Sequence, residues 1–316
     1  MQSSILLILG GLILLYLGGE FLVRGAGSLA LRLGLTPLVA GLTVVAFGTS
    51  MPEMVASVKA TLAGQGDIAI GNVIGSNTFN IGFILGITAL IYPLKVGAQA
   101  LRFDAPVMVA VVILPLWFLH DRLVTQVEAA ILCALVVVYT VVVVRMARRK
   151  PETQAVLQEF GDAAPKVSKS AFLDVALVVG GLVILVFGSN WLIDGSVAIA
   201  KAFGVSEAII GLTIVAAGTS TPELAASLVA AFRKQPDIAL GNIIGSNVFN
   251  ILAITGVAGS VQPIYAPGVS MMDVAVMITM SVALLPMIRS GGTLDRSEGF
   301  CLLLGYGVYL YWLWPK

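Results

Sequence analysis

The chain has 316 residues, of which 58% are hydrophobic and only 11% are charged, and its mean hydropathy is +1.00. A water-soluble fold of this size cannot bury so much apolar surface, so the composition predicts an integral membrane protein. The net charge of +1 provides no basic or acidic field that would indicate a nucleic acid or an acidic partner.

Apolar runs of about 20 residues recur along the chain, as helices crossing a hydrocarbon core about 30 Å thick require, and they lack the alternation of membrane β-strands. We therefore expect an all-α membrane protein. The first run has no basic segment or cleavage site, which favours a retained span over a signal peptide. Ten transmembrane helices are expected, at about residues 5–23, 36–61, 68–92, 103–120, 126–145, 172–193, 206–231, 237–262, 269–288 and 298–314. The polar stretch 146–171 is expected to be a solvated cytoplasmic linker.

One stretch of the chain occurs twice. Residues 41–93 and 211–263 align without a gap at an offset of 170 residues, with 29 identities in 53 positions. Flanking glycines repeat as well, so we expect residues 1–145 and 172–316 to form two related five-helix halves. A half with an odd number of spans begins and ends on opposite sides of the membrane, which makes the halves inverted repeats. Inverted repeats around a midplane site are typical of secondary transporters.

The basic residues predict the orientation of the chain. If the linker between the halves is cytoplasmic, 14 of the 18 lysine and arginine residues fall on the cytoplasmic side and four fall on the other. This is the bias of the positive-inside rule. We therefore expect a multi-pass protein of the cell (inner) membrane with both termini outside.

Two polar clusters interrupt the apolar spans, each present once in either half. The first reads G-T-S-x-P-E, at residues 48–53 and 218–223. It contains Glu53 and Glu223, the only carboxylates expected deep within a span, where an ionisable group costs about 2.5–3.5 kcal/mol. The proline before each glutamate cannot donate a helical hydrogen bond, so a carbonyl near the Gly-Thr-Ser segment is freed and can coordinate a cation.

The second cluster reads G-N-x-I-G-S-N-x-F-N. It offers the amide oxygens of Asn80 and Asn250 and, one helical turn earlier on the same face, the hydroxyls of Ser76 and Ser246. No cysteine, histidine or methionine joins these oxygen donors, which argues against copper, zinc or iron. Two carboxylates with several neutral oxygens fit Ca²⁺ or Na⁺ better than Mg²⁺, which demands octahedral geometry.

The paired G-T-S-x-P-E and G-S-N-x-F-N segments resemble the α-repeats of the cation/calcium exchanger superfamily, specifically those of prokaryotic sodium/calcium antiporters, over nearly the whole chain. The resemblance implies an antiporter that exchanges Na⁺ for Ca²⁺, and not an enzyme. Both ions are then transported substrates in a lipid bilayer, with no cofactor, nucleic acid or obligate protein partner. The cation ligands that it implies are Glu53, Glu223, Asn80, Thr49, Thr219, Ser50, Ser220, Ser76 and Ser246, with the carbonyls of Ala46 and Ala216.

Asn250 departs from the pattern of part of this family. Some prokaryotic members and the potassium-dependent branch carry aspartate at the matching position, so asparagine here argues against potassium dependence. The side chain still offers an amide oxygen as a candidate ligand. Only two carboxylates then remain, Glu53 and Glu223, which together neutralise one Ca²⁺ or two Na⁺.

Two other functions remain open at this stage. Protons compete with metal ions for paired buried carboxylates, so a calcium/proton antiporter of the same superfamily is the nearest alternative. That branch typically resembles G-N-x-x-E where this chain has G-S-N-x-F-N. A cation channel with a carboxylate ring is disfavoured by the inverted, non-identical halves. For an exchanger, we expect spans two, three, seven and eight to form a fixed core, across which spans one and six move.

Overall fold

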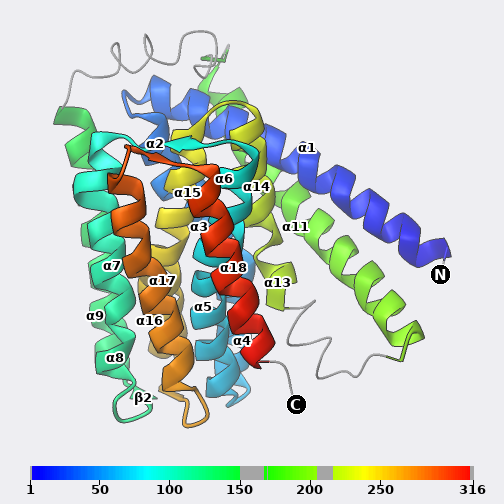
Figure 1. The fold of residues 1–316 in the computed structure, drawn as a ribbon, viewed down its shortest axis with the longest axis vertical. Coiled ribbons are helices and arrows are strands. Elements are labelled where there is room, and N and C mark those ends of the chain that lie inside the picture. Colours follow the sequence, from blue (N-terminus) through cyan, green and yellow to red (C-terminus); the bar gives the residue numbers. More distant parts are fainter. Residues whose placement is uncertain (1, 150–166, 169, 205–215, 314–316) are drawn as a thin grey trace.

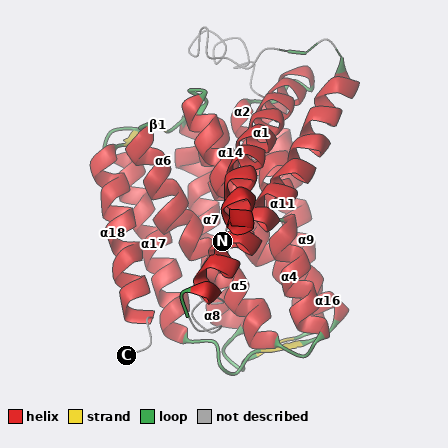
Figure 2. Cartoon of the chain, turned by 90° about the vertical axis from the view of Figure 1, so that its right-hand side faces the viewer, coloured by secondary structure: helices red, strands yellow, loops and turns green. Residues whose placement is uncertain are grey.

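The computed structural model describes residues 2–149, 167–168, 170–204 and 216–313. These residues fold into a bundle of helices (Figures 1 and 2). Most of the expected linker 146–171 and the first part of the expected seventh span, 206–231, lie outside the described residues.

Each half contains long helices and broken ones. In the first half the helical segments are α1 Gln2–Arg32, α2 Pro37–Ala40, η1 Gly41–Val45, α3 Ala46–Thr49, α4 Met51–Leu62, α5 Gly66–Phe79, η2 Asn80–Leu85, α6 Gly86–Ile91, η3 Ala100–Asp104, α7 Ala105–Ile113, α8 Pro115–Phe118 and α9 Gln126–Arg149. In the second they are α11 Ala171–Ala202, α13 Ala216–Thr219, α14 Thr221–Phe232, α15 Pro236–Phe249, η6 Asn250–Ile254, α16 Thr255–Val261, α17 Met271–Arg289 and α18 Arg296–Leu313. The η segments are π-helical turns, which occur mostly as short bulges inside α-helices and often at functional sites.

The structure supports a multi-pass membrane protein. Within the described residues, seven helical segments are long and apolar enough to cross a membrane. An eighth is the pair Pro37–Thr49 and Met51–Leu62, which is bent by 43°. Of the two other expected spans, the seventh is described only from Ala216 onward, and α18 is not among these apolar segments. The count of ten spans therefore stays a prediction.

The first and sixth spans are longer than expected. Hydropathy placed their ends at about residues 23 and 193, but α1 has 31 residues and α11 has 32. At 1.5 Å per residue each helix is roughly 45–50 Å long, more than the thickness of the hydrocarbon core, so both helices must tilt or extend beyond it. The helices continue through polar residues and end before Gly34 and Gly204, whose φ angles are +69° and +75°.

Helices α1 and α11 pack against each other as an antiparallel pair at one side of the bundle (Figure 1). Their contact runs along facing glycines. A Cβ on Gly18 would lie 2.9 Å from the Gly181 carbonyl oxygen, and a Cβ on Gly181 would lie 2.8 Å from the Gly18 carbonyl oxygen. Gly11 and Gly188 meet in the same way, with Gly11 nearer the start of α1 and Gly188 nearer the end of α11. Small residues let the two backbones approach this closely.

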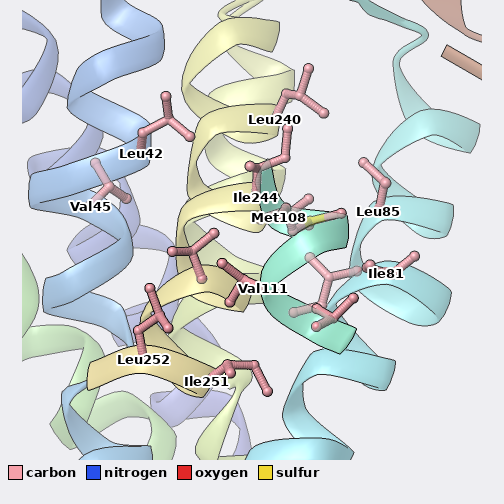
Figure 3. Packing of buried hydrophobic residues seen from close by; sticks show 14 of the residues in the cluster. Leu42, Val45, Ile81, Leu85, Met108, Val111, Leu240, Ile244, Ile251 and Leu252 are labelled. Carbon is pink, nitrogen blue, oxygen red and sulfur yellow. The ribbon is translucent and has the colours of Figure 1, made fainter. Parts of the chain in front are cut away.

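The centre of the bundle is α15. The most apolar stretch of Pro236–Val261 is 100% buried, whereas the corresponding stretches of α1 and α11 are each only 28% buried. Aliphatic side chains such as Leu42, Ile81 and Ile244 fill the space around α15 (Figure 3). The long pair α1–α11 therefore presents most of its surface to the membrane, and the broken helices form the interior.

Two short antiparallel strand pairs join loops of the two halves. Strand β1 (Leu94–Lys95) pairs with β4 (Thr293–Leu294), and β2 (Leu123–Val124) pairs with β3 (Ile264–Tyr265). Adding the 170-residue offset of the repeat to β1 gives β3, and subtracting it from β4 gives β2. The two pairs are thus related by exchange of the halves.

Candidate cation site

In each G-T-S-x-P-E cluster the helix is interrupted at the serine, and the glutamate lies in the first turn of the helix that follows. Helix α3 ends at Thr49, Ser50 leaves the helical geometry with φ −80° and ψ 5°, and α4 restarts at Met51 with proline in its first turn. The second half repeats this at Ser220, with φ −87° and ψ 9°, before α14. Glu53 and Glu223 therefore lie in the first turns of α4 and α14, where the positive end of the helix dipole favours a carboxylate.

The two halves exchange hydrogen bonds at these glutamates. The Ser50 hydroxyl donates to Glu223 Oε1 at 3.0 Å, and the Ser220 hydroxyl donates to Glu53 Oε1 at 2.8 Å. Both carboxylates are buried, with 1% of each residue exposed. The structure thus brings the two predicted clusters, 170 residues apart in sequence, into one place inside the bundle.

Five oxygen atoms of predicted ligand residues are buried without a hydrogen-bond partner among the described residues. They are Glu53 Oε2, Glu223 Oε2, Asn80 Oδ1, Asn250 Oδ1 and Ser246 Oγ. A buried polar atom without a partner is destabilising, so such atoms in a native fold call for an explanation. Bound cations supply one, because Ca²⁺ and Na⁺ prefer carboxylate, amide and hydroxyl oxygens.

Hydrogen bonds between asparagine side chains also join the two halves. Asn80 Nδ2 donates to Asn247 Oδ1 at 3.5 Å, and Asn250 Nδ2 donates to Asn77 Oδ1 at 3.3 Å. Asn80 and Asn250 each open a π-helical turn, η2 and η6. Because the NH₂ groups are engaged in this way, the amide oxygens of Asn80 and Asn250 remain available for a cation. Asn77 and Asn247 were not predicted to act here, although both stand in the repeated G-S-N segment.

A second pair of asparagines, also not predicted, supports the glutamate helices. Asn242 Nδ2 donates to the Glu223 carbonyl at 3.2 Å and to Ser227 Oγ at 2.9 Å. Asn72 does the same for the Glu53 carbonyl and Ser57 Oγ, at the same two distances. These bonds attach α15 to α14 and α5 to α4. The sequence signal was the asparagine of G-N-x-I-G, which is identical in both halves.

The remaining predicted residues lie in the same segments. Thr49 is buried, and its hydroxyl lies 3.0 Å from the Val45 carbonyl and 3.2 Å from Asn242 Oδ1. The Ala46 carbonyl accepts from the Ser50 amide at 3.1 Å. Ser76 is buried, Thr219 is half-buried, and Ala216 is described only as the first residue of α13. These positions agree with ligand roles but do not test them.

The structure also buries a carboxylate outside the two clusters, which the sequence analysis did not single out. Asp104, at the end of η3 in the fourth span, is buried as completely as the two glutamates. Glu20 lies within α1, is only partly buried, and is paired with Arg24 of the same helix and with Arg233 after α14. Hydropathy alone does not find such residues, since the burial of Asp104 depends on packing between helices.

A buried, oxygen-lined site shared by the two halves of a helical membrane bundle is the arrangement of an ion transporter. The chain belongs to the sodium/calcium exchanger family: the family described as "Sodium/calcium exchanger protein" matches residues 3–145 and 173–314. This confirms membership of the cation/calcium exchanger superfamily.

Individual relatives agree with the family match. The "Putative antiporter CaxA" of Alkalimonas amylolytica is 39% identical, and the alignment covers 100% of both chains. The "Sodium/calcium exchanger MaX1" of Methanosarcina acetivorans is 31% identical, with 97% of each chain covered. A solved structure of the sodium-calcium exchanger NCX_Mj, soaked with zero Na⁺ and Ca²⁺, superposes with a TM-score of 0.85 at 30% identity and covers 99% of both chains.

Proposed function

We propose that the chain is a secondary antiporter that exchanges Na⁺ for Ca²⁺ by alternating access. The observation that carries the proposal is the set of buried oxygens without a partner from Glu53, Glu223, Asn80, Asn250 and Ser246. Hydrogen bonds join the two halves both at the glutamates and at the asparagines of this set. The printed names of the relatives support the choice of ions, since one is a sodium/calcium exchanger and the matched structure is a sodium-calcium exchanger.

We infer that the fold consists of ten spans in two inverted five-helix repeats. The reciprocal hydrogen bonds of Ser50 and Ser220 and the antiparallel α1–α11 pair support this symmetry. The buried helices α3–α6 and α13–α16 form the fixed core, and α1 and α11 move across it. The distribution of basic residues supports a cell (inner) membrane location with both termini outside.

Charge compensation couples the two ions. Glu53 and Glu223 together neutralise one Ca²⁺ or two Na⁺, and the ions exclude each other because they share oxygen ligands. A site without cations leaves carboxylates unpaired in a medium of low dielectric constant, which opposes movement of the empty carrier. The ions are transported substrates, and the proposal requires no resident cofactor and no protein partner.

Radiolabelled calcium uptake into proteoliposomes tests the proposal. An outward gradient of Na⁺, H⁺ or K⁺ is imposed separately, and wild type is compared with Glu223→Gln and with the control Glu128→Gln. Glu128 is a suitable control because its carboxylate caps the start of α9, where it accepts from the Thr125 amide at 2.8 Å.

We expect uptake to follow the sodium gradient, to be lost in Glu223→Gln and to persist in Glu128→Gln. Uptake that follows only the proton gradient would assign the chain to calcium/proton exchange, which the paired carboxylates also permit. Calcium entry that no counter-ion gradient affects would identify a channel and overturn the antiporter.

A further inference from the structure

Two buried aspartates lie apart from the glutamate pair, and one of them, Asp174, is paired with Arg32. Asp104 closes the π-helical turn η3 at the start of the fourth span, and none of its surface is exposed. Neither of its carboxylate oxygens has a hydrogen-bond partner in the part of the chain that the structure describes. An ionised carboxylate in such surroundings is strongly disfavoured unless another group neutralises it.

Two side chains with unused donors lie near enough to this carboxylate to interact with it. Gln99 precedes η3 and its amide lies beside the Asp104 carboxyl. Tyr139 of α9 is buried and interacts electrostatically with Asp104. Gln99 Nε2 and the Tyr139 hydroxyl are themselves buried without a partner among the described residues. The side chains of Asp104, Gln99 and Tyr139 thus lie in the same region, between the start of the fourth span and the fifth span.

The second half contains an equivalent aspartate and tyrosine, but their hydrogen bonding and exposure differ. D-A-P-V-M at Asp104–Met108 recurs as D-V-A-V-M at 273–277, and Tyr139 recurs as Tyr309. There the Tyr309 hydroxyl donates to Asp273 Oδ1 at 3.0 Å, and both side chains are partly exposed. Asp273 is therefore hydrogen-bonded and lies partly exposed at the surface of the bundle. Asp104, in contrast, is fully buried and has no hydrogen-bond partner among the described residues.

No basic group compensates Asp104 among the described residues. Among the side chains that the structure describes, the other ionisable groups on its own turn and on α9 and α17 are Arg102 on η3, Glu128, Cys133, Tyr139 and Arg145 on α9, and Asp273 and Arg289 on α17. The three arginines are exposed, and Glu128 is held by Thr125 at the start of α9. The salt bridges within the described ranges do not include Asp104.

We propose that Asp104 is a second ion-binding site of this protein and that its ligand is a proton. The proton resides on one carboxyl oxygen, which leaves the group neutral, and the unused donors of Gln99 and Tyr139 lie near the other oxygen. A metal ion fits this place less well, because Asp104, Tyr139 and Gln99 offer few oxygens, whereas Ca²⁺ takes six to eight. The assignment depends on the burial of Asp104 and not on the proposed exchange of Na⁺ for Ca²⁺.

The proton site is connected to the cation site through one side chain. Met108 lies on α7, one turn after Asp104, and its fully buried side chain faces α15 and η2 (Figure 3). Its sulfur accepts from Asn247 Nδ2 at 3.7 Å, and Asn247 Oδ1 accepts from Asn80. Asp104 therefore lies one turn before the residue that contacts Asn247, and Asn247 in turn accepts a hydrogen bond from the predicted ligand Asn80.

Infrared spectroscopy of the protein in lipid, with saturating Ca²⁺ and at neutral pH, detects the proton directly through the carbonyl stretch of a neutral carboxyl group. We expect this band in wild type and in Asp273→Asn, and its loss in Asp104→Asn. Removing one hydroxyl should shift the band in Tyr139→Phe and leave it in place in the matched control Tyr309→Phe. The tyrosine pair decides the question if Asp104→Asn does not fold.

Four results would overturn the assignment. Three of them are absence of the band from the wild-type protein, an unchanged band in Asp104→Asn, and a band that responds to Tyr309→Phe instead of Tyr139→Phe. Loss of the band on addition of Na⁺, with Ca²⁺ still present, would also contradict a proton and would identify Asp104 as a sodium ligand. None of these readouts uses transport, so they stand whether or not the exchange proposal holds.

Discussion

Replacement of Gly181 by alanine tests the contact between α1 and α11. A Cβ at this position would lie 2.6 Å from the Leu22 amide nitrogen and 2.8 Å from the Gly18 carbonyl oxygen. Both neighbours are backbone atoms, so no side chain can rotate away, and the helices must separate by several tenths of an ångström. Overpacking of this kind costs about 1–3 kcal/mol.

The adjacent residue Gly180 provides a matched control. A Cβ there meets nothing within 4 Å in the described structure. Both substitutions replace a glycine in a helix interior with alanine, which stabilises the helix by about 1 kcal/mol. This stabilisation is the same in the two variants and cancels when they are compared. We therefore expect Gly181→Ala to be less stable than Gly180→Ala by about 1–3 kcal/mol, the cost of the lost close approach.

Thermal unfolding in detergent, followed for wild type and both variants in parallel, measures this difference. Calcium exchange in proteoliposomes is measured on the same samples, because α1 and α11 are the proposed moving pair. We expect a lower melting temperature and slower exchange only for Gly181→Ala. Equal melting temperatures for the two alanine variants would refute the glycine-mediated contact.

Two further substitutions test the polar interior. Asn242→Asp replaces the donor to the Glu223 carbonyl and Ser227 with a charged acceptor, so we expect a stability loss of about 2–6 kcal/mol and reduced calcium uptake. The control is Gln126→Glu, the same change of amide to carboxylate at the exposed start of α9. If both variants unfold alike, Asn242 does not support the site. Glu20→Gln leaves Arg233 without its ion pair, and we expect about 1–2 kcal/mol of destabilisation, because the arginine side chain is partly exposed. An unchanged melting temperature would show that this pair contributes nothing.

Much of the candidate site could be predicted because its residues are repeated. Composition indicated a membrane protein, and identical clusters in two apolar spans singled out Glu53 and Glu223. The structure places both glutamates together, as expected, and leaves one oxygen of each without a partner in the described residues. The supporting asparagines Asn72 and Asn242 stand in the same motif, but their role appears only through their contacts.

Helix ends and burial were harder to predict. Hydropathy detects where polar residues begin, but α1 and α11 continue as helices past those residues. Likewise, an aspartate near the start of a span is usually taken to face water. Asp104 is instead enclosed by neighbouring helices, and its counterpart Asp273 is not, although their local sequences are alike.

The sequence by itself determined the membrane class, the repeat, the family resemblance and the oxygen-rich chemistry of the two clusters, because these follow from composition and local pattern. Only the tertiary structure decided that Ser50 donates to Glu223 and Ser220 to Glu53, contacts that span 173 and 167 residues. It also decided which of two similar aspartates is buried. The physical reason is that contacts across the halves arise from the packing of whole helices, which no local pattern encodes.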